Sequence, residues 1–306
     1  MPRPKVTWES VRTAIEGGLG VGFGENYKPA LSIKRWNASP VSVQVLKALP
    51  NFNRQCHFFS HSEWLLALLF SWVGCHIREQ FPLWPWPSNH PEFSRFPELD
   101  YQLTSSIGML EICKDTGIKH GNFIGTNIPY IWSIDLCAFM PWIDDIKRST
   151  CFISVKPLMT EQYLYVDPFN RGVEKLEGER RYAQQLGINY FVGDRSLFPG
   201  PIFSNLEMLA PAADLPKNHP WNNLLDSFLN KHHHLLQDEP LSSIRERLIK
   251  DFKCQAGVAS YIKNYILWNQ LIDCDLSKHI KDSLPAIKGG RKLIQSLRKT
   301  LSGEIR

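Results

Sequence analysis

Two short apolar segments in the middle of the chain stand out from the mixed hydrophobic and polar positions around them. They cover residues 131–139 (IWSIDLCAF) and 151–157 (CFISVKP). Both are rich in β-branched and aromatic residues and are bounded by residues that interrupt secondary structure, which predicts two buried strands. The polar residues at 144–148 between them favour a turn, so we expect the two strands to pair as a hairpin.

Each predicted strand contains one charged residue where a buried strand rarely has one. Asp135 interrupts the first segment, and Lys156 lies at the end of the second. Buried charges are paired or bind a metal, and the hairpin would bring these two together. A carboxylate that holds Mg²⁺ beside a lysine that positions water suits phosphodiester hydrolysis. A structural ion pair fits the same pattern, and ion pairs are commoner than active sites.

A predicted helix before this hairpin contributes a second candidate carboxylate. The apolar run after His61 predicts a helix to about Trp72, and Ser60 and Glu63 have the spacing of a capping box. In that role the Glu63 side chain accepts a hydrogen bond from the Ser60 backbone N–H. Alternatively, Glu63 faces the strand pair and supplies a second carboxylate to a metal ion. The spacing alone favours the cap.

Further segments predict a mixed α/β fold in this part of the chain. Strands are expected at 31–36, 41–46, 75–81 and 188–192, and helices at 10–16, 105–116 and 172–186. The strand at 75–81 should stop at Pro82, because proline donates no ladder hydrogen bond. The charged residues of the helix at 172–186 are expected to form mostly a solvated face, with Gly187 as its C-cap.

The glycine-rich residues 17–24 resemble a phosphate-binding loop only superficially. They lack a following Lys-Ser/Thr pair, and their spacing does not match the dinucleotide-binding pattern. A tightly turned or flexible segment is therefore favoured over direct contact with phosphate.

The composition changes near Asp194. Prolines punctuate residues 198–220, which predicts a linker or a loosely helical region. Helices are expected beyond it at 221–230, 241–252, 255–271 and 290–301. We therefore expect a mixed α/β domain over residues 1–196 and a small, mostly helical domain over residues 197–306. Consecutive residues do not face one way on a helix, so the histidines at 232–234 are expected to be solvated or capping.

Composition and charge narrow the class of protein. The chain has 306 residues and a formal net charge of +5, which permits nucleic-acid binding without requiring it. Its seven cysteines include no C-x-x-C pair, which favours reduced, buried thiols in a cytosolic protein. No apolar run reaches the length of a membrane span, and no signal-peptide core follows the N-terminus. We expect a cytoplasmic protein without a membrane partner.

Several short motifs occur in an order that resembles one family. They are GFGENYKP at 22–29, HSE at 61–63, IREQFPL at 77–83, GIKH at 117–120, SID at 133–135, VKP at 155–157 and EGERRY at 177–182. In this order they resemble TnsA, the endonuclease subunit of heteromeric bacterial transposases. No single motif is specific to that family, whereas the ordered set is. The resemblance covers roughly the first two thirds of the chain.

The resemblance implies a restriction-endonuclease-like catalytic domain with a mixed central sheet and Mg²⁺-dependent endodeoxyribonuclease activity. The residues that match the catalytic positions of the family are Glu63, Asp135 and Lys156. Both carboxylates would bind Mg²⁺, for which Mn²⁺ can substitute, and the Val155 carbonyl would be a further ligand. Where the family has Glu or Gln, this chain has Ser154, whose neutral hydroxyl is a weaker ligand. The number of metal ions, one or two, therefore stays open.

The same resemblance implies a role in cut-and-paste DNA transposition in a bacterial cytoplasm. The enzyme would cut DNA at the 5′ ends of the transposon, and a separate transposase subunit would cut and join the 3′ ends. An ATPase regulator would dock on the helical C-terminal domain. Two alternatives remain: a stand-alone restriction or repair nuclease of the same fold, and a catalytically inactive DNA-binding adaptor, which Ser154 makes conceivable.

Overall fold

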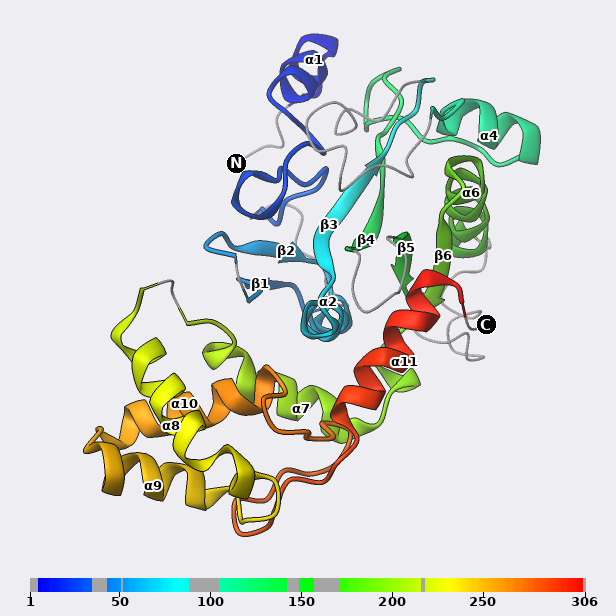
Figure 1. The fold of residues 1–306 in the computed structure, drawn as a ribbon. Coiled ribbons are helices and arrows are strands. Elements are labelled where there is room, and N and C mark those ends of the chain that lie inside the picture. The colour runs from blue at the N-terminus through cyan, green and yellow to red at the C-terminus, as the bar shows by residue number, and fades with distance from the viewer. Residues whose placement is uncertain are drawn as a thin grey trace. The chain divides into compact units, whose positions relative to one another are not determined.

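The chain forms two compact units in the computed structural model, which describes residues 5–34, 43–50, 52–87, 105–141, 149–156, 171–215 and 218–304 (Figure 1). The first unit comprises Met1–Ala48, Phe52–Ser196 and Lys299–Arg306. The second comprises Leu49–Asn51 and Leu197–Arg298. Leu301, near the C-terminus, thus belongs to the first unit, and its carbonyl accepts a hydrogen bond from Asn189 Nδ2 (3.2 Å).

A four-stranded mixed sheet forms the centre of the first unit. Its strands lie in the order β3 (His76–Leu83), β4 (Trp132–Met140), β5 (Ser149–Val155) and β6 (Asn189–Gly193). The pairs β3–β4 and β4–β5 are antiparallel, whereas β5–β6 is parallel. The predicted pairing of the two apolar segments is confirmed as β4–β5, although the turn at 144–148 lies outside the described residues.

Helices and a small second sheet surround these strands. The α-helices of the first unit in the described residues are α1 (Trp8–Glu16), α2 (His61–Val73), α4 (Met109–Thr116) and α6 (Arg171–Leu186). Strands β1 (Val45–Lys47) and β2 (Cys56–Phe58) pair antiparallel, and η1 (Gly24–Asn26) is a short 3₁₀ turn. The helices predicted in these regions are confirmed, and Gly187 ends α6 in the left-handed conformation (φ 68°).

The hydrophobic core of the first unit joins the sheet to α4 and α6. Phe81, Ile134 and Phe152 come from three adjacent strands, and Met109 and Tyr182 come from the two helices; all five side chains are buried. Burial of an apolar side chain of this size contributes roughly 1.5–3 kcal/mol. The core therefore fixes α6 against the strands, which matters because α6 carries a buried carboxylate.

Three strand predictions are wrong in detail. Strand β3 continues through Pro82 to Leu83. It lies at the edge of the sheet, where a missing N–H can face away from the ladder. Residues 31–34 form no strand, and residues 35–42 lie outside the described part of the chain. The segment predicted at 41–46 contributes only the start of β1.

The glycine-rich segment packs tightly against β3. A Cβ atom on Gly20 (φ 74°) would lie 2.3 Å from Pro82 Cγ, so only glycine fits there. The Tyr27 hydroxyl donates to the Glu79 carbonyl (3.1 Å), and the Ala30 N–H donates to the Gln80 carbonyl (2.9 Å). The glycine-rich segment is thus the tight turn that the sequence favours. The residues that follow it donate hydrogen bonds to backbone carbonyls of the edge strand β3.

Gly178 on α6 gives a prediction about how this helix is seated. Added to Gly178, a Cβ atom would lie 2.9 Å from a ring atom of Trp132 and 3.1 Å from Met109 Cε. Gly178→Ala is therefore expected to destabilise the protein by about 1–3 kcal/mol through overpacking. Thermal denaturation measures the change.

The matched control is Gly257→Ala on helix α10 (Ala256–Trp268), where an added Cβ meets nothing within 4 Å. There the better helix propensity of alanine should leave stability unchanged or raised. Equal destabilisation by both variants would contradict the tight packing of α6.

The second unit is helical. It contains α7 (Gly200–Leu209), α8 (Pro220–Leu236), α9 (Ser242–Phe252), α10 and most of α11 (Gly290–Ser302), with 3₁₀ turns η2 (Arg195–Leu197) at its start and η3 (Ala210–Ala212) after α7. The four helices predicted beyond residue 220 are confirmed. The proline-rich region, expected to be a linker or loosely helical, contains the regular helix α7, because Pro201 lies in its first turn, where the missing N–H costs nothing.

The prediction for the three consecutive histidines is wrong at His232. Its side chain is buried, and Nε2 lies 2.8 Å from Asp251 Oδ2 while Nδ1 lies 3.2 Å from Arg247 Nη1. Its ring also packs near Phe228 and Phe252. The residue is a hydrogen-bonded core histidine, whereas the next two histidines are exposed.

The cysteines and the helix lengths agree with the composition. All seven cysteines are free thiols, and six of them are buried. Burial raises the pKa of Cys113 to about 11 and that of Cys274 to about 12, so both thiols are neutral and unreactive at pH 7. None of the described helices combines the length and the apolar character that crossing a membrane requires.

Candidate functional site

The end of β5 brings together the two charged residues that interrupt the apolar segments. Lys156 Nζ lies 2.7 Å from Asp135 Oδ2. The same oxygen accepts the Val155 backbone N–H at 2.8 Å, and Lys156 Nζ also donates to the Val155 carbonyl at 3.1 Å. The Lys156 N–H donates to the Gly193 carbonyl (3.0 Å), which extends the β5–β6 ladder and fixes the backbone at this point.

The ion pair sets the charges of both groups. Asp135 is buried, and burial by itself raises the pKa of a carboxyl group. The charge of Lys156, helped by Lys175 and the Val155 N–H, outweighs that effect and holds the pKa of Asp135 below its usual value. Burial lowers the pKa of Lys156, but Asp135 and Glu179 raise it more, so the net pKa lies above the usual lysine value. The pair is therefore ionised at neutral pH.

Glu63 takes part in the N-terminal cap of α2 and is also buried. Its N–H donates to the N-cap Ser60 Oγ (3.1 Å), while its carboxylate accepts the Phe59 N–H at Oε2 (2.9 Å) and the Ser60 hydroxyl at Oε1 (3.1 Å). The predicted reach back to the Ser60 N–H is wrong by one residue, because the carboxylate takes the Phe59 N–H instead. The side chain is 4% exposed and also faces the interior.

The electrostatic state of Glu63 links it to the ion pair. Burial and the negative charge of Asp135 raise the pKa of Glu63 to about 8, against the opposing effects of Lys156 and its hydrogen bonds. Glu63 and Asp135 are therefore close enough to repel. A buried carboxyl beside a second carboxylate is typical of a site that receives a cation.

Gln80 and Ser133 complete the connection between helix and sheet. Gln80 Nε2 donates to Glu63 Oε2 (3.1 Å), and the Ser133 hydroxyl donates to Gln80 Oε1 (2.9 Å). All three residues are buried. Reasoning from residue types missed both, although Gln80 and Ser133 lie inside two of the family-like motifs, which was the available signal.

Ser154, the position that departs from the family pattern, faces another carboxylate. Its hydroxyl forms a short hydrogen bond to Glu179 Oε2 on α6. The Tyr190 hydroxyl lies 3.0 Å from Ser154 Oγ and 3.1 Å from Glu179 Oε2, and Lys175 Nζ lies 3.3 Å from Glu179 Oε1. Glu179 is 1% exposed, so the expectation of a solvated charged face does not hold for this residue. Burial and Glu179 raise the pKa of Tyr190, which is neutral.

The oxygen donors fit a hard divalent cation. Glu63, Asp135 and the Val155 carbonyl carry oxygen atoms of the kind that Mg²⁺ prefers, and Mg²⁺ is usually bound through one or two carboxylates together with water and substrate phosphate. Among the described residues, no group of three or more His, Cys, Asp or Glu side chains is placed to hold a metal ion. Mg²⁺ does not require such a group, because it uses a sparser set of protein ligands.

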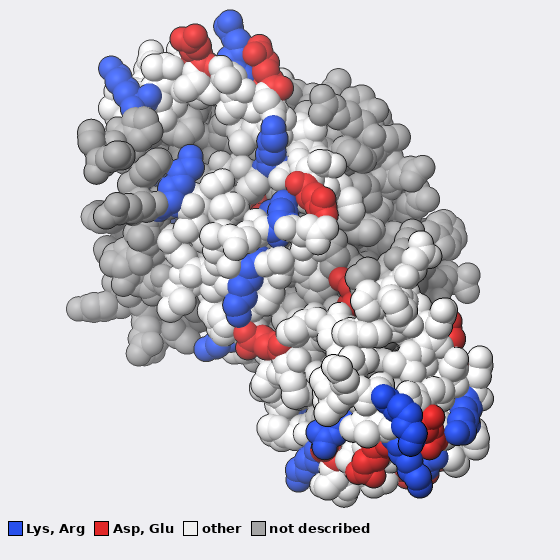
Figure 2. Space-filling model, turned by 90° about the vertical axis from the view of Figure 1, so that its left-hand side faces the viewer, with Lys and Arg blue, Asp and Glu red and all other residues white. Residues whose placement is uncertain are grey.

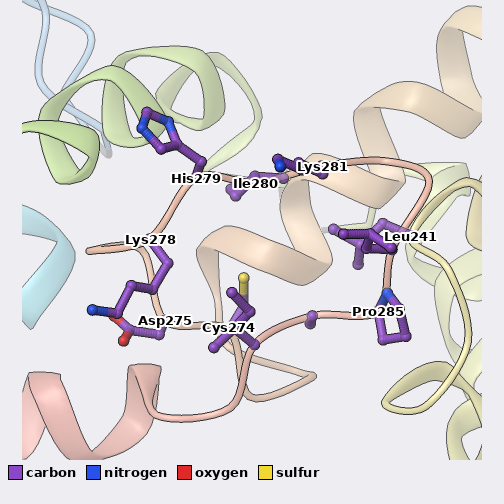
Figure 3. A pocket seen from close by; sticks show the side chains of 11 residues that line it. Leu241, Cys274, Asp275, Lys278, His279, Ile280, Lys281 and Pro285 are labelled. Carbon is purple, nitrogen blue, oxygen red and sulfur yellow. The ribbon is translucent and has the colours of Figure 1, made fainter.

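The second unit contains a cavity of about 300 Å³ between the loop after α10 and the start of α9 (Figure 3). Leu241, Cys274 and Pro285 line it together with Asp275 and Lys278. The Cys274 thiol is neutral at pH 7, because burial raises its pKa. Asp275 is the one acidic residue among those that line the cavity, so the cavity lacks the two buried carboxyl groups and the ion-paired lysine of the site near β5.

Surface charge does not locate a ligand by itself. On the face shown in Figure 2, Lys and Arg side chains of the first unit stand apart, and Asp and Glu side chains lie among them. This face carries no continuous basic surface among the described residues. The case for a phosphate-containing substrate therefore rests on the buried carboxylates and Lys156.

Comparisons with known proteins agree with the motif order. No family model matches the chain. The chain is similar to the transposon Tn7 transposition protein TnsA of Escherichia coli, with 29% identity over 201 residues. The matched region covers 64% of this chain and 60% of that protein, so the similarity spans well under two thirds of the relative. The sequence similarity and the mixed α/β sheet together indicate a TnsA-like relationship.

Proposed function

We propose that this protein is the metal-dependent DNA endonuclease subunit of a heteromeric transposase, with a restriction-endonuclease-like catalytic unit. The observation that carries the proposal is the ion pair at the end of β5, where Lys156 Nζ lies 2.7 Å from Asp135 Oδ2 and the charges of both residues act on the buried Glu63 carboxyl. The similarity to a protein named for Tn7 transposition supports the biological context. The reaction is hydrolysis of the phosphodiester at the 5′ ends of the transposon.

The proposed chemistry divides between a cation and the lysine. Glu63, Asp135 and the Val155 carbonyl would hold Mg²⁺, or Mn²⁺ in its place, and the bound ion supplies Lewis-acid stabilisation of the phosphate and the leaving oxygen. Lys156 stays protonated because Asp135 raises its pKa. A protonated lysine cannot accept a proton, so it acts by donating hydrogen bonds that orient the attacking water and offset phosphate charge.

Glu179 supplies negative charge behind Ser154. The hydroxyl of Ser154 is a weak ligand, but its hydrogen bond to a buried carboxylate makes the oxygen more electron-rich. A water molecule bound to the Ser154 hydroxyl would thus interact with Glu179 through Ser154. This arrangement counts against the inactive-adaptor alternative, for which Ser154 was the main argument.

Glu179→Gln is expected to weaken metal binding about 10–100-fold, the usual cost of removing an outer-shell carboxylate. The charge is lost while the side-chain shape and the hydrogen bond to Ser154 can persist. Titration with Mn²⁺ measures the affinity, and Tyr190→Phe, which removes one hydroxyl from the same cluster, is the control with a smaller expected loss. Unchanged affinity in Glu179→Gln would limit Glu179 to a structural role.

The proposed function is tested by cleavage of transposon-end DNA with Mg²⁺ or Mn²⁺, with and without the cognate transposase subunit. Cutting at the 5′ ends that requires both metal and partner is the expected result. Cutting of naked DNA without the partner would instead favour a stand-alone nuclease. Retained DNA binding without any cutting would favour the adaptor.

Docking of an ATPase regulator on the helical second unit belongs to the same proposal. It is tested by a pull-down of the regulator with variants of the surface residues of that unit.

A further inference from the structure

Gln80 has an unusual backbone conformation at the centre of the candidate site. Its φ angle is 48°, which is uncommon for a residue with a long side chain, and the residue is only 2% exposed. The β3–β4 ladder passes from Glu79–Leu136 to Phe81–Ile134, so Gln80 lies at an interruption opposite Asp135. Strained backbone of this kind concentrates at functional sites.

The surrounding structure holds this conformation in place. The Gln80 carbonyl accepts the Ala30 N–H at 2.9 Å, and the Glu79 carbonyl accepts the Tyr27 hydroxyl at 3.1 Å. Gly20 packs directly against Pro82 on the other side of Gln80. The N-terminal segment therefore fixes the edge strand on both sides of the strained residue.

The side-chain amide then determines how Glu63 presents its two oxygens. Glu63 Oε2 accepts two hydrogen bonds, from the Phe59 N–H (2.9 Å) and from Gln80 Nε2 (3.1 Å). Glu63 Oε1 accepts one, from the Ser60 hydroxyl (3.1 Å), and no other donor in the described residues reaches it. When Glu63 is ionised, as it must be to bind a cation, each carboxylate oxygen accommodates about two hydrogen bonds, so Oε2 is filled and Oε1 keeps one acceptor position.

We propose that Gln80 is a positioning residue that selects Glu63 Oε1 as the oxygen offered to a divalent cation. The hydrogen bond from Ser133 to Gln80 Oε1 (2.9 Å) fixes the orientation of the amide, because it reserves the oxygen end and directs the N–H₂ group to Glu63. Gln80 thus ties the helix glutamate to the sheet that carries Asp135. This inference rests on the proposed function, since it presupposes that Glu63 binds a metal ion.

Two substitutions of Gln80 separate the effect of its side-chain amide on metal binding from the effect of its strained backbone. Gln80→Gly removes the amide and relieves the positive φ, whereas Gln80→Met removes the amide but keeps the strain and most of the side-chain volume. In the full-length protein, both variants are expected to bind Mn²⁺ alone about 10-fold or more weakly, as measured by calorimetric titration. Their thermal stabilities should differ, with the glycine variant the more stable of the two.

The outcomes distinguish this inference from the proposed function. Wild-type affinity in both variants, or a loss confined to Gln80→Met that follows its lower stability, overturns the role of the amide. Asp135→Ala is the reference, because it removes a proposed ligand. If the wild type binds no Mn²⁺, or if Asp135→Ala binds it equally well, the proposed metal site itself is wrong, and this inference fails with it.

Discussion

Asp135→Ala is expected to reduce metal-dependent cleavage of transposon-end DNA by roughly a thousandfold or more. A metal ion contributes several kcal/mol to stabilising a phosphoryl transition state, and each 1.36 kcal/mol is a factor of ten in rate. Asp135 is also the group that holds Lys156 in place, at 2.7 Å. Its removal therefore disturbs both parts of the proposed chemistry at once. A strand-cleavage assay with the cognate transposase measures the loss.

Lys156→Ala and Asp135→Asn divide this effect into its parts. Lys156→Ala keeps the carboxylate and should retain metal binding while losing most cleavage. Asp135→Asn keeps the shape of the side chain but removes its negative charge, so metal binding and DNA cleavage should both fall. Glu9→Gln, an exposed carboxyl on α1, is the control and should cleave like the wild type. Full activity in Asp135→Ala would mean that the catalytic site lies elsewhere.

Glu63→Gln is expected to abolish cleavage while making the metal-free protein more stable at neutral pH. The pKa of Glu63 is about 8 in the folded protein, compared with 4.5 for an unperturbed glutamate. At pH 7 the Glu63 carboxyl is ionised in the unfolded chain but still protonated in the folded protein. Taking up this proton lowers the free energy of unfolding by about 3 kcal/mol. Glutamine needs no proton, so the variant avoids this cost.

The pH dependence has a definite sign. A carboxyl whose folded pKa is raised stabilises the fold most below pH 4.5, and that contribution is lost as the pH rises through 8. In chelator, wild-type stability should therefore fall by about 3 kcal/mol between pH 5 and pH 8 relative to Glu63→Gln. Denaturant unfolding at both pH values measures the difference.

The same measurement has a built-in control. Glu9→Gln should follow the wild type at both pH values, because the Glu9 side chain is exposed. Saturating Mn²⁺ should reverse the order of stability, since the ion binds the wild type and not Glu63→Gln. A stability difference that does not change with pH would show that Glu63 is not held protonated.

Glu63 shows how far local spacing reaches. The Ser60–Glu63 spacing predicts an N-cap, and the Ser60 hydroxyl accepts the Glu63 N–H at 3.1 Å. Spacing cannot tell that the same carboxylate is buried near Asp135, because that depends on where α2 packs against the sheet. The cap and the candidate ligand role are compatible because the cap fills only part of the carboxylate: the Phe59 N–H donates to Oε2 and the Ser60 hydroxyl to Oε1, which leaves one acceptor position on Oε1.

Glu179 and Gln80 show what spacing leaves out. Along α6, Glu179 is one of several charged residues with i,i+3 and i,i+4 partners, which is the pattern of a solvated face. Only the packing of α6 on the sheet, through the Gly178–Trp132 contact, buries it against Ser154. Gln80 is marked in the sequence only by its place in the IREQFPL motif, because the contacts that hold its backbone come from residues fifty or more positions away.

The sequence by itself determined the strands β4 and β5, their pairing, the helices around them and the Asp135–Lys156 contact. These follow from apolar periodicity and from pairing between segments close in the chain, which local physics dictates. Tertiary structure alone decided that Glu179 stands behind Ser154 and that Gln80 links helix to sheet, and it decided between the two positions that the sequence left open for the Glu63 carboxylate. Each depends on burial and on contacts between distant segments, and these exist only once the core has packed.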